Sequence, residues 1–311
     1  MEAAQIKNYG DASVIEISDI IIPIPSQGQV QIEVIAASIN PFDYKLRSGM
    51  FKDMIPLQFP ITLGGDIAGT VMAVGDGVRN FAIGDIVFGQ ANVVAGNSGA
   101  FAEIAVTSAS QIAIAPRNIT MTEVASLPLV GSSALQALQE HLNLQKDQKI
   151  FIHGGSGGIG SLAIQIAKHI GAHVATTATG DSIDFVKKLG ADEIIDYATE
   201  RFHTKLKNFD AVFDTVGGND FRLSLEILKP GSVAVSMVGH VDKTEADKLH
   251  VTALSQNTQV TTERLNELCG LVESGVVSPQ VGGVYPLSKI VEAFQDLESR
   301  KVRGKIVLEI V

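Results

Sequence analysis

The feature that most constrains the fold of this chain is a glycine-rich segment near its middle, Gly154-Gly155-Ser156-Gly157-Gly158-Ile159-Gly160. Gly155, Gly157 and Gly160 match the pattern G-x-G-x-x-G, whose glycines allow a tight turn, a close approach of the backbone to a pyrophosphate, and close packing of helix on strand. The apolar stretch Phe151-Ile152-His153 precedes the pattern, and an apolar stripe at helical spacing follows it. A strand before the pattern and a helix after it predict a dinucleotide site, with the pyrophosphate at the helix N-terminus. We therefore expect residues Gly155, Ser156, Gly157, Gly158, Ile159 and Gly160 to contact a dinucleotide.

The residues that end the second expected strand bear on the choice of dinucleotide. An enzyme specific for NAD usually carries Asp or Glu about 20 residues beyond the pattern, where the carboxylate binds the ribose 2′-hydroxyl. Here the strand ends in Ala175-Thr176-Thr177-Ala178-Thr179, with small hydroxyl side chains and no carboxylate. We expect Thr176 and Thr177 to donate hydrogen bonds to a 2′-phosphate, so that NADPH binds more tightly than NADH. No arginine stands beside them, and the expected preference is therefore moderate.

The chain changes character along its length. Residues 1–123 hold short alternating stretches such as Val30-Gln31-Ile32-Glu33-Val34, separated by glycine turns, which predict a β-rich domain. Residues 123–139 are expected to form one helix. From Lys149 onward strands alternate with helices, the strands lying at 149–153, 173–177, 193–196, 210–214 and 232–237. This alternation predicts a doubly wound parallel sheet, so the expected fold class is α/β with a separate β-rich part.

Charge and cysteine content exclude several classes of protein. The 311 residues carry a formal net charge of −10, which argues against nucleic acid and an anionic membrane as main partners. The basic run Arg300-Lys301-Val302-Arg303-Gly304-Lys305 is expected to be a solvated turn before the last strand. With Cys269 as its single cysteine, the chain has no internal disulfide and no multi-cysteine zinc site. It has no apolar run of about 18 residues and no apolar signal core, so we expect a cytoplasmic location.

Six further segments carry recognisable motifs: Asn40-Pro41-Phe42-Asp43-Tyr44-Lys45-Leu46-Arg47-Ser48-Gly49, Leu63-Gly64-Gly65-Asp66-Ile67-Ala68-Gly69, Val74-Gly75 to Gly84-Asp85, Leu129-Val130-Gly131-Ser132-Ser133, Asp214-Thr215-Val216-Gly217-Gly218 and Arg303-Gly304-Lys305. Together with the glycine pattern they resemble the zinc-independent quinone oxidoreductases (zeta-crystallin-like) of the medium-chain dehydrogenase/reductase superfamily. The resemblance covers nearly the whole chain. It implies a GroES-like catalytic domain over residues 1–123, rejoined by residues 260–311, and a Rossmann NADP-binding domain over residues 124–259. It also implies an active site in the cleft between the two domains.

The metal ligands of zinc-dependent relatives are missing from this sequence. Zinc-dependent alcohol dehydrogenases of the same superfamily bind catalytic zinc through a cysteine, a histidine and a second cysteine. Those places fall here on Asn40, Gly65 and Ser132. Glycine has no side-chain ligand, and neutral amide and hydroxyl groups are poor zinc ligands beside thiolate and imidazole. The four-cysteine structural zinc lobe is absent as well, so we expect no metal.

The lack of zinc changes the expected chemistry. Alcohol oxidation needs a Lewis acid to stabilise an alkoxide, whereas a quinone or an enone delocalises the charge that a hydride brings. The protein then positions nicotinamide and substrate and donates hydrogen bonds to the developing oxyanion. Asn40, Tyr44 and Lys45 are the candidate catalytic donors, and the resemblance favours Asn40 and Tyr44. The alternative for Tyr44 and Lys45 is packing and surface charge.

Four further residues are candidates for cofactor contact. We expect Ser133 at the nicotinamide carboxamide, Tyr197 at the adenosine end, and Gly239 where the backbone passes the cofactor. Val216, in the motif after the fourth strand of the sheet, is expected to contact the cofactor as well.

These observations predict an NADPH-dependent quinone oxidoreductase that works without zinc. Reduction of the C=C bond of 2-alkenals or enones by NADPH is the alternative within the same chemistry. A regulatory protein that binds NADPH with little turnover is the alternative from a different class. The strand around Val251–Leu254 is expected at the edge of the dinucleotide-binding sheet, where related enzymes form dimers, so we expect a homodimer.

Overall fold

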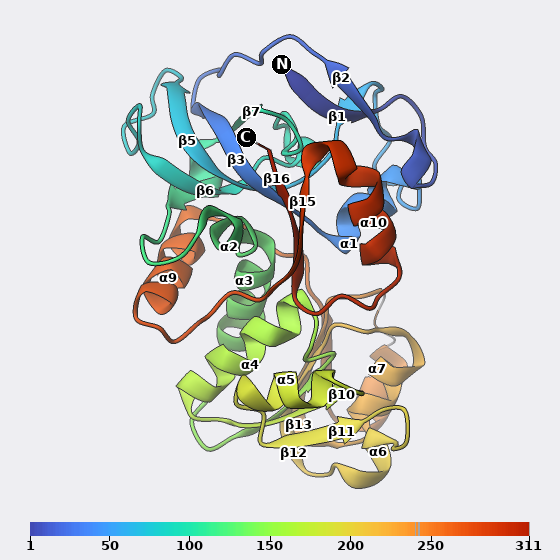
Figure 1. Cartoon of the computed structure of the whole chain (residues 1–311). Helices are drawn as coiled ribbons and strands as arrows, with labels where there is room; N and C mark the ends of the chain where they lie inside the picture. Colours follow the sequence, from blue (N-terminus) through green and yellow to red (C-terminus); the bar gives the residue numbers. More distant parts are fainter. Residues whose placement is uncertain (240, 242, 311) are drawn as a thin grey trace. The chain divides into compact units, whose positions relative to one another are not determined.

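The computed structural model describes residues 1–239, 241 and 243–310, which form two compact units (Figure 1). Unit 1 comprises Met1–Leu129, Val260–Ser274 and Pro279–Val311, and unit 2 comprises Val130–Gln259 and Gly275–Ser278. The chain first leaves unit 1 a few residues beyond the expected position after residue 123, because helix α2 (Met121–Ala125) packs on strands of unit 1. No helix in the described part of the chain is long and apolar enough to cross a membrane.

Unit 2 is built on a six-stranded sheet in which every neighbouring pair of strands is parallel. The strand order is β11 (Glu193–Asp196), β10 (His173–Ala178), β9 (Lys149–His153), β12 (Phe209–Asp214), β13 (Leu228–Ser236) and β14 (Thr252–Ser255). The chain starts in the middle, at β9, and winds first to one side and then to the other. The order therefore reverses between β9 and β12, and ligands of doubly wound sheets bind outside the carboxyl ends of the strands at such a point. The expected α/β fold is confirmed.

The helices of unit 2 cover this sheet (Figure 1). Helices α4 (Gly158–Ile170) and α5 (Ser182–Lys188) pack on β9, β10 and β11, and α7 (Gly218–Leu225) and α8 (Lys243–Lys248) pack on β12, β13 and β14. The short α6 (Phe202–Lys205) follows β11. Helix α4 buries its apolar stripe, including Leu162, Ala163, Ile166 and Ala167, as its helical spacing predicts.

The single helix expected over residues 123–139 is wrong. The segment forms α2, then α3 (Pro128–Leu135), then a π-helix over Gln136–His141. Thr120 caps α2, because its Oγ1 accepts a hydrogen bond from the Glu123 N–H at 3.3 Å. Pro128 begins the next helix, where its missing N–H is tolerated.

Unit 1 is mainly antiparallel, as its alternating sequence predicts. Its larger sheet has the order β15 (Val281–Pro286), β16 (Lys305–Glu309), β3 (Gln29–Ile39), β5 (Asp66–Val74), β6 (Ile86–Gln90) and β8 (Ile112–Ile114), and β7 (Ile104–Ser108) also pairs with β3. A second sheet joins β2 (Glu16–Asp19), β1 (Glu2–Ile6) and β4 (Ile61–Thr62). Helices α1 (Pro41–Arg47), α9 (Thr262–Glu273) and α10 (Ile290–Glu298) complete the unit. Because β16 pairs with β3, the C-terminal strand completes the sheet that holds the N-terminal residues (Figure 1).

Candidate functional site

The glycine loop between β9 and α4 is tightly packed on one side and open on the other. A Cβ on Gly160 would lie 2.3 Å from the Gly154 carbonyl oxygen, and a Cβ on Gly155 would lie 2.2 Å from Thr176 Oγ1, so neither position accepts a side chain. A Cβ on Gly157 would meet nothing closer than the Gly154 oxygen at 3.5 Å. Gly157 also has an ordinary φ of −78°. The protein itself therefore does not require glycine at residue 157, whereas a pyrophosphate close to the backbone would.

The two threonines at the end of β10 are both buried, at 0% and 3% exposure, but they make different hydrogen bonds. Thr176 is fully buried, and its Oγ1 donates a 2.6 Å hydrogen bond to the Ile152 carbonyl oxygen. The expectation that Thr176 donates to a 2′-phosphate is therefore corrected: its hydroxyl supports the glycine loop. Thr177 Oγ1 accepts a hydrogen bond from the Gly154 N–H at 3.1 Å, which leaves the hydroxyl proton of Thr177 to donate elsewhere.

The loop after β12 is held by a buried carboxylate. Asp214 is fully buried and accepts hydrogen bonds from the N–H groups of Val216 at 3.2 Å and Gly217 at 3.0 Å, and from Ser236 Oγ at 2.7 Å. His153 Nδ1, at the end of β9, lies 3.2 Å from Asp214 Oδ1. These contacts fix the loop at the carboxyl ends of β9 and β12, where the strand order reverses. Val216, in this loop, exposes 47% of its surface.

The other predicted cofactor residues of unit 2 also follow strands. Gly239 comes after β13 with φ +85°, and no atom that the structure describes outside its chain neighbours lies within 4 Å of where its Cβ would be. Tyr197 follows β11 and is 55% exposed, and its N–H donates to the Ala178 oxygen beside the end of β10. Ser133 instead lies on helix α3: it is fully buried, and its Oγ is 2.8 Å from Thr258 Oγ1. Its hydroxyl therefore already takes part in a hydrogen bond within unit 2.

In unit 1 the predicted donor Asn40 lies at the start of α1 and is 2% exposed. Its Nδ2 donates a 2.8 Å hydrogen bond to Asp66 Oδ2, and its Oδ1 accepts a hydrogen bond from Lys305 Nζ. Lys305 Nζ also donates to the Ile39 carbonyl oxygen at 2.8 Å and lies 3.6 Å from Asp66 Oδ2. The Asn40 amide is thus held between a buried carboxylate and a buried amine.

Three further groups belong to this cluster: the Ser38 hydroxyl, the Leu129 N–H and the Asp43 carboxyl. Ser38 Oγ donates to Asp66 Oδ2 at 3.1 Å, and the Leu129 N–H donates to Asp66 Oδ1 at 3.1 Å. Asp43, which is 3% exposed, accepts a 2.7 Å hydrogen bond from the Asn40 backbone N–H. The cluster therefore contains two carboxyl groups and one amine, and all three side chains are almost completely buried.

Burial shifts the pKa values of all three groups. Burial raises the pKa of Asp43 to about 7, although the hydrogen bond from the Asn40 N–H opposes the shift. Burial also raises the pKa of Asp66, against the effects of Lys305, Asn40 and the other donors. Burial lowers the pKa of Lys305, and the charges of Asp66 and Asp43 oppose that change. Such shifts are frequent at functional sites.

Tyr44 and Lys45 lie on α1 next to this cluster in the sequence. Tyr44 is half-buried and packs against the core of unit 1, and its hydroxyl makes no hydrogen bond with the described residues. Lys45 is also half-buried; burial lowers its pKa, and so does the charge of Arg300. Both α1 residues are thus partly packed, and the Tyr44 hydroxyl has no hydrogen-bond partner among the described residues.

The charged residues of the buried cluster around Asn40 are ones for which the sequence predicts no role. Asp66 and Lys305 stood within two of the quoted motifs, and Asp43 lay beside Asn40, without any function being expected for them. The expected solvated turn is right for Arg300, Lys301 and Arg303, which are exposed, and wrong for Lys305, which is buried. One sequence feature does indicate that Lys305 is buried. It stands directly before the apolar run Ile306-Val307-Leu308, which places a charge at the start of a buried strand.

The donor set does not fit a metal ion. No group of three His, Cys, Asp or Glu side chains among residues 1–239, 241 and 243–310 is placed to bind one. A Cβ on Gly65 would instead lie 3.5 Å from Gln90 Nε2 and 3.7 Å from Asn92 Nδ2. Amide groups therefore surround the position that a histidine ligand would occupy, and amide nitrogens do not coordinate zinc as imidazole does.

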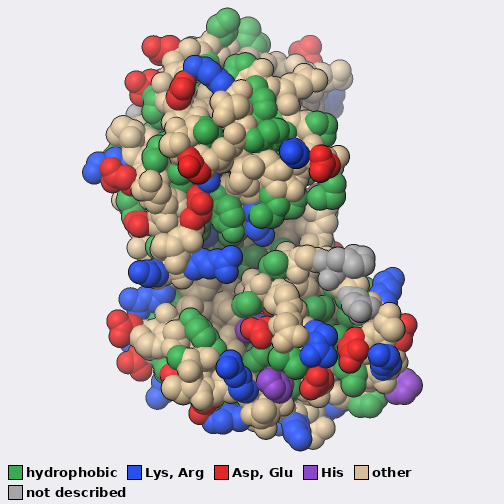
Figure 2. All heavy atoms as spheres, turned by 90° about the vertical axis from the view of Figure 1, so that its right-hand side faces the viewer, with side chains coloured by type: hydrophobic (Ala, Val, Ile, Leu, Met, Phe, Trp, Pro, Cys, Tyr) green, Lys and Arg blue, Asp and Glu red, His purple; other side chains and the backbone are tan. Residues whose placement is uncertain are grey.

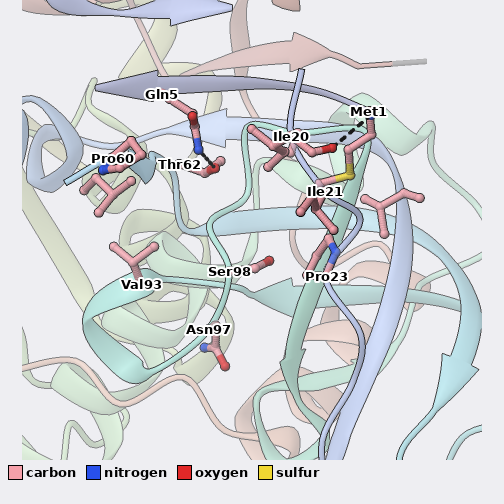
Figure 3. Close-up of a pocket in the computed structure, with 13 residues that line it drawn as sticks. Met1, Gln5, Ile20, Ile21, Pro23, Pro60, Thr62, Val93, Asn97 and Ser98 are labelled. Carbon is pink, nitrogen blue, oxygen red and sulfur yellow. Dashed lines mark hydrogen bonds between the residues drawn. The ribbon is translucent and has the colours of Figure 1, made fainter. Parts of the chain in front are cut away.

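A shallow pocket of about 350 Å³ lies elsewhere in unit 1 (Figure 3). Its wall is mainly apolar, with Ile20, Ile21, Pro23 and Val93, and its polar pair Gln5 and Thr62 is joined by a 3.3 Å hydrogen bond. It contains none of the predicted site residues. On the face shown in Figure 2, Lys and Arg side chains lie among Asp and Glu side chains.

Comparison with known proteins gives two matching families. Residues 26–117 match the family described as alcohol dehydrogenase GroES-like domain, and residues 189–308 match the family described as zinc-binding dehydrogenase. The first match lies in the β-rich part of unit 1. The second covers most of the parallel sheet of unit 2 and extends into β16.

Individual relatives match over nearly the whole chain. A protein of Arabidopsis thaliana named NADPH-dependent alkenal/one oxidoreductase, chloroplastic, is 33% identical over 99% of this chain and 79% of its own length. The structure of the quinone oxidoreductase from Coxiella burnetii has a TM-score of 0.92 at 33% identity and covers 100% of this chain and 99% of that one. The Escherichia coli quinone oxidoreductase complexed with NADPH has a TM-score of 0.89 at 27% identity, with both chains covered completely.

Proposed function

Since this chain belongs to the medium-chain dehydrogenase/reductase superfamily and, within it, to the quinone oxidoreductase type, we propose that it transfers hydride from NADPH to a quinone. The observation that carries the proposal is the glycine loop, which is closed by packing at Gly155 and Gly160 and open at Gly157. An open backbone at a helix N-terminus fits a pyrophosphate. NADPH is the cofactor, and the hydride is the chemistry that it supplies when bound.

We propose that residues of unit 2 hold NADPH. The backbone N–H groups of residues 155–160 bind the pyrophosphate. The Thr177 hydroxyl, whose proton remains free to donate, gives a hydrogen bond to the ribose end of NADPH. Tyr197 serves the adenosine end, and Val216 and Gly239 line the nicotinamide half, since β12 and β13 lie on the other side of the strand reversal. Ser133, bound to Thr258, supports this half of the site from within unit 2.

We propose that unit 1 supplies the hydrogen-bond donors for the substrate carbonyl. Hydride addition places negative charge on the carbonyl oxygen, and donors fixed in advance stabilise that charge. The Tyr44 hydroxyl and the Asn40 amide are such donors. Lys45, which follows Tyr44 on α1, is the third candidate donor.

We propose that the reaction proceeds without zinc. Asn40, Gly65 and Ser132 occupy the ligand positions, and the amides of Gln90 and Asn92 lie around Gly65. A quinone or an enone needs no Lewis acid as strong as the one an alcohol requires, because conjugation spreads the charge over several atoms. Hydrogen bonds from amide and phenol groups are then sufficient.

Reduction of a conjugated C=C bond is the second candidate function. The name of the Arabidopsis relative, an alkenal/one oxidoreductase, favours it. The same donors would serve an enone carbonyl, since charge develops on its oxygen when hydride adds to the distal carbon. A regulatory protein with little turnover is less well supported, because both the dinucleotide loop and the donors are present.

The test is an NADPH oxidation screen with the metal-free protein across quinones, 2-alkenals and cyclic enones. We expect steady turnover with at least one class and no loss after treatment with a chelator. Zinc bound at about one ion per chain and lost together with activity would contradict the zinc-free mechanism. Binding of NADPH with no turnover of any acceptor would favour the regulatory alternative.

The homodimer and the cytoplasmic location stay predictions. Strand β14 ends the six-stranded sheet, and its outer edge pairs with no strand in the described residues, which supports dimerisation through that edge. Light scattering that gives the mass of a single chain, 32.9 kDa, would contradict the dimer. Cell fractionation tests the cytoplasmic location. The alternative is an organelle, as in the Arabidopsis relative, whose name is chloroplastic.

A further inference from the structure

The Asn40 side chain is the only described carboxamide that we find between a buried amine and a buried carboxylate, Lys305 and Asp66. All three residues are at most 5% exposed. Lys305 reaches the site from β16, near the C-terminus, and Asp66 from the start of β5, and both strands pair with β3 directly before Asn40. The sheet thus brings both groups to one amide, where Lys305 Nζ lies at its oxygen, Asp66 Oδ2 at its nitrogen, and the two charged groups lie 3.6 Å apart.

The two neighbours determine which way the amide faces. An ammonium group only donates hydrogen bonds, so the Asn40 atom next to Lys305 Nζ is the oxygen. A carboxylate only accepts them, so the atom 2.8 Å from Asp66 Oδ2 is the nitrogen. Nδ2 carries two hydrogens, and only one of them is used by Asp66. The second has no partner among the described residues.

We propose that Lys305 is a positioning residue for Asn40, which it orients and polarises so that the free N–H of Asn40 serves the substrate carbonyl. The proposal rests on the proposed function, in which Asn40 is a donor. A hydrogen bond from the amine to the amide oxygen draws electron density toward that oxygen and makes the amide N–H a stronger donor. Lys305 itself does not contact the substrate. Its contacts are Asn40, the Ile39 carbonyl oxygen and Asp66.

Lys305→Met tests the proposal, because it keeps an unbranched chain of similar length and removes the amine. With quinone and NADPH we expect kcat to fall by about tenfold or more, while KM changes by less than about threefold. The dissociation constant of NADPH should stay unchanged, because NADPH binds to unit 2. The matched control is Lys301→Met, which removes the same charge from an exposed position of the preceding loop and should leave kcat unchanged.

A double-mutant cycle separates positioning from an independent effect. In an Asn40→Ala background, Lys305→Met should change kcat by less than about threefold, since no amide remains to be oriented. Equal losses in the two backgrounds would overturn the proposal. If Lys305→Met does not fold, Lys305→Gln takes its place in the cycle, because it keeps a donor without the charge.

A measurement without turnover tests the same point. In protein labelled with ¹⁵N at asparagine, the Nδ2 signals of Asn40 are assigned by their absence in Asn40→Ala. We expect these side-chain protons to exchange with solvent at least about tenfold faster in Lys305→Met than in the unchanged protein. Equal exchange rates would overturn the proposal. The exchange rate can be measured even if the protein reduces no acceptor. Such a lack of turnover would contradict the proposed function and not the orientation of Asn40 by Lys305.

Discussion

Tyr44 and Asn40 differ in how much of their polar groups the fold already uses. The Asn40 amide is bound by Asp66 and Lys305, whereas the Tyr44 hydroxyl makes no hydrogen bond with the described residues. The ring of Tyr44 packs against the core, which restricts its orientation. A phenol held in this way gives a hydrogen bond to a ligand without first breaking one inside the protein.

We therefore predict that Tyr44→Phe lowers kcat by roughly 10- to 100-fold and raises KM much less. The expected loss is moderate because a quinone spreads the charge that the phenol stabilises. The unfolding free energy should stay nearly the same, because no internal hydrogen bond is lost. Unchanged kcat in both Tyr44→Phe and Asn40→Ala would mean that these residues only pack.

Asp43 gives the stability of the protein a pH dependence with a defined sign. Its pKa is raised from 3.8 to about 7, so the folded protein holds a proton that the unfolded chain releases between those pH values. The stability contribution of Asp43 is therefore present below its unfolded pKa and is lost as the pH rises through about 7. Asp43→Asn removes this titration, and its side-chain oxygen can still accept from the Asn40 N–H.

We predict that the unfolding free energy of the unchanged protein, relative to Asp43→Asn, falls as the pH rises from about 5 to about 8. The fall should be of order 1 kcal/mol or more, since one pKa unit corresponds to about 1.4 kcal/mol. Asp66 and Lys305 are present in both proteins, so the difference reports Asp43 together with its electrostatic effect on these two neighbours. Urea unfolding at several pH values measures it, and parallel curves would contradict the assignment.

The sequence predicted single residues best where geometry requires a particular amino acid. Gly155 and Gly160 were recognisable because no other residue fits beside Thr176 and the Gly154 oxygen. The partners of Asn40 were not, because Lys305 and Asn40 are far apart in the sequence and meet only through the pairing of β16 with β3. Thr176 was misassigned for a similar reason. The pattern shows a hydroxyl but not that the Ile152 oxygen receives its hydrogen bond.

The junction of β9 with α4 is the element to which we assign the pyrophosphate of NADPH. Its glycines fall into two kinds, those required by packing within the protein and those required by a ligand. Gly160 belongs to the first kind, with a Cβ distance of 2.3 Å to a backbone oxygen, and Gly157 to the second. Variants at the two positions therefore separate folding from binding.

We predict that Gly157→Ala folds with a loss of less than about 1 kcal/mol but weakens NADPH binding by at least about tenfold. Gly160→Ala should instead destabilise the protein by about 3 kcal/mol, since the helix must move away from the loop. Denaturant unfolding and fluorescence titration with NADPH measure the two effects. Normal NADPH affinity in Gly157→Ala would mean that the pyrophosphate does not bind at this loop.

We assign the choice between the two dinucleotides to the end of β10. We predict that Thr177→Asp weakens NADPH binding relative to NADH by roughly 1–3 kcal/mol, because a carboxylate repels a 2′-phosphate. An aspartate can still accept the hydrogen bond from the Gly154 N–H, so the loop is retained. Thr204→Asp, which adds the same charge on the exposed surface of α6, is the control. An unchanged ratio of the two dissociation constants in Thr177→Asp would contradict this role.

At the level of elements, the periodicity of the sequence was a good guide to strands and a poorer one to helix boundaries. Strands β9 and β11 lie where their apolar runs predicted, because buried parallel strands need continuous apolar sequence. The segment 121–141 divides into two α-helices and a π-helix instead of one helix. Its apolar residues recur throughout, so the pattern did not show where Pro128 starts a new helix.

The whole molecule combines two units with separate contributions to one reaction. Unit 2 carries the loop for the dinucleotide, and unit 1 carries the donors and the buried Asp66–Lys305 pair. The assignment of residues 305–309 to unit 1 followed from the family resemblance and not from periodicity, because pairing between distant strands has no local signal. The matches to known oxidoreductases cover both units, so the whole chain belongs to the family, not one unit alone.

The central claim is that hydride passes from NADPH to a conjugated carbonyl compound, and isotope transfer measures this directly. The metal-free protein is incubated with a cyclic enone and NADPH deuterated at C4 of the nicotinamide, in separate samples for the two C4 positions. We predict that one of the two samples gives a saturated ketone with deuterium at the carbon β to the carbonyl. Product without deuterium from either sample, or no product with any enone or quinone, would contradict the account.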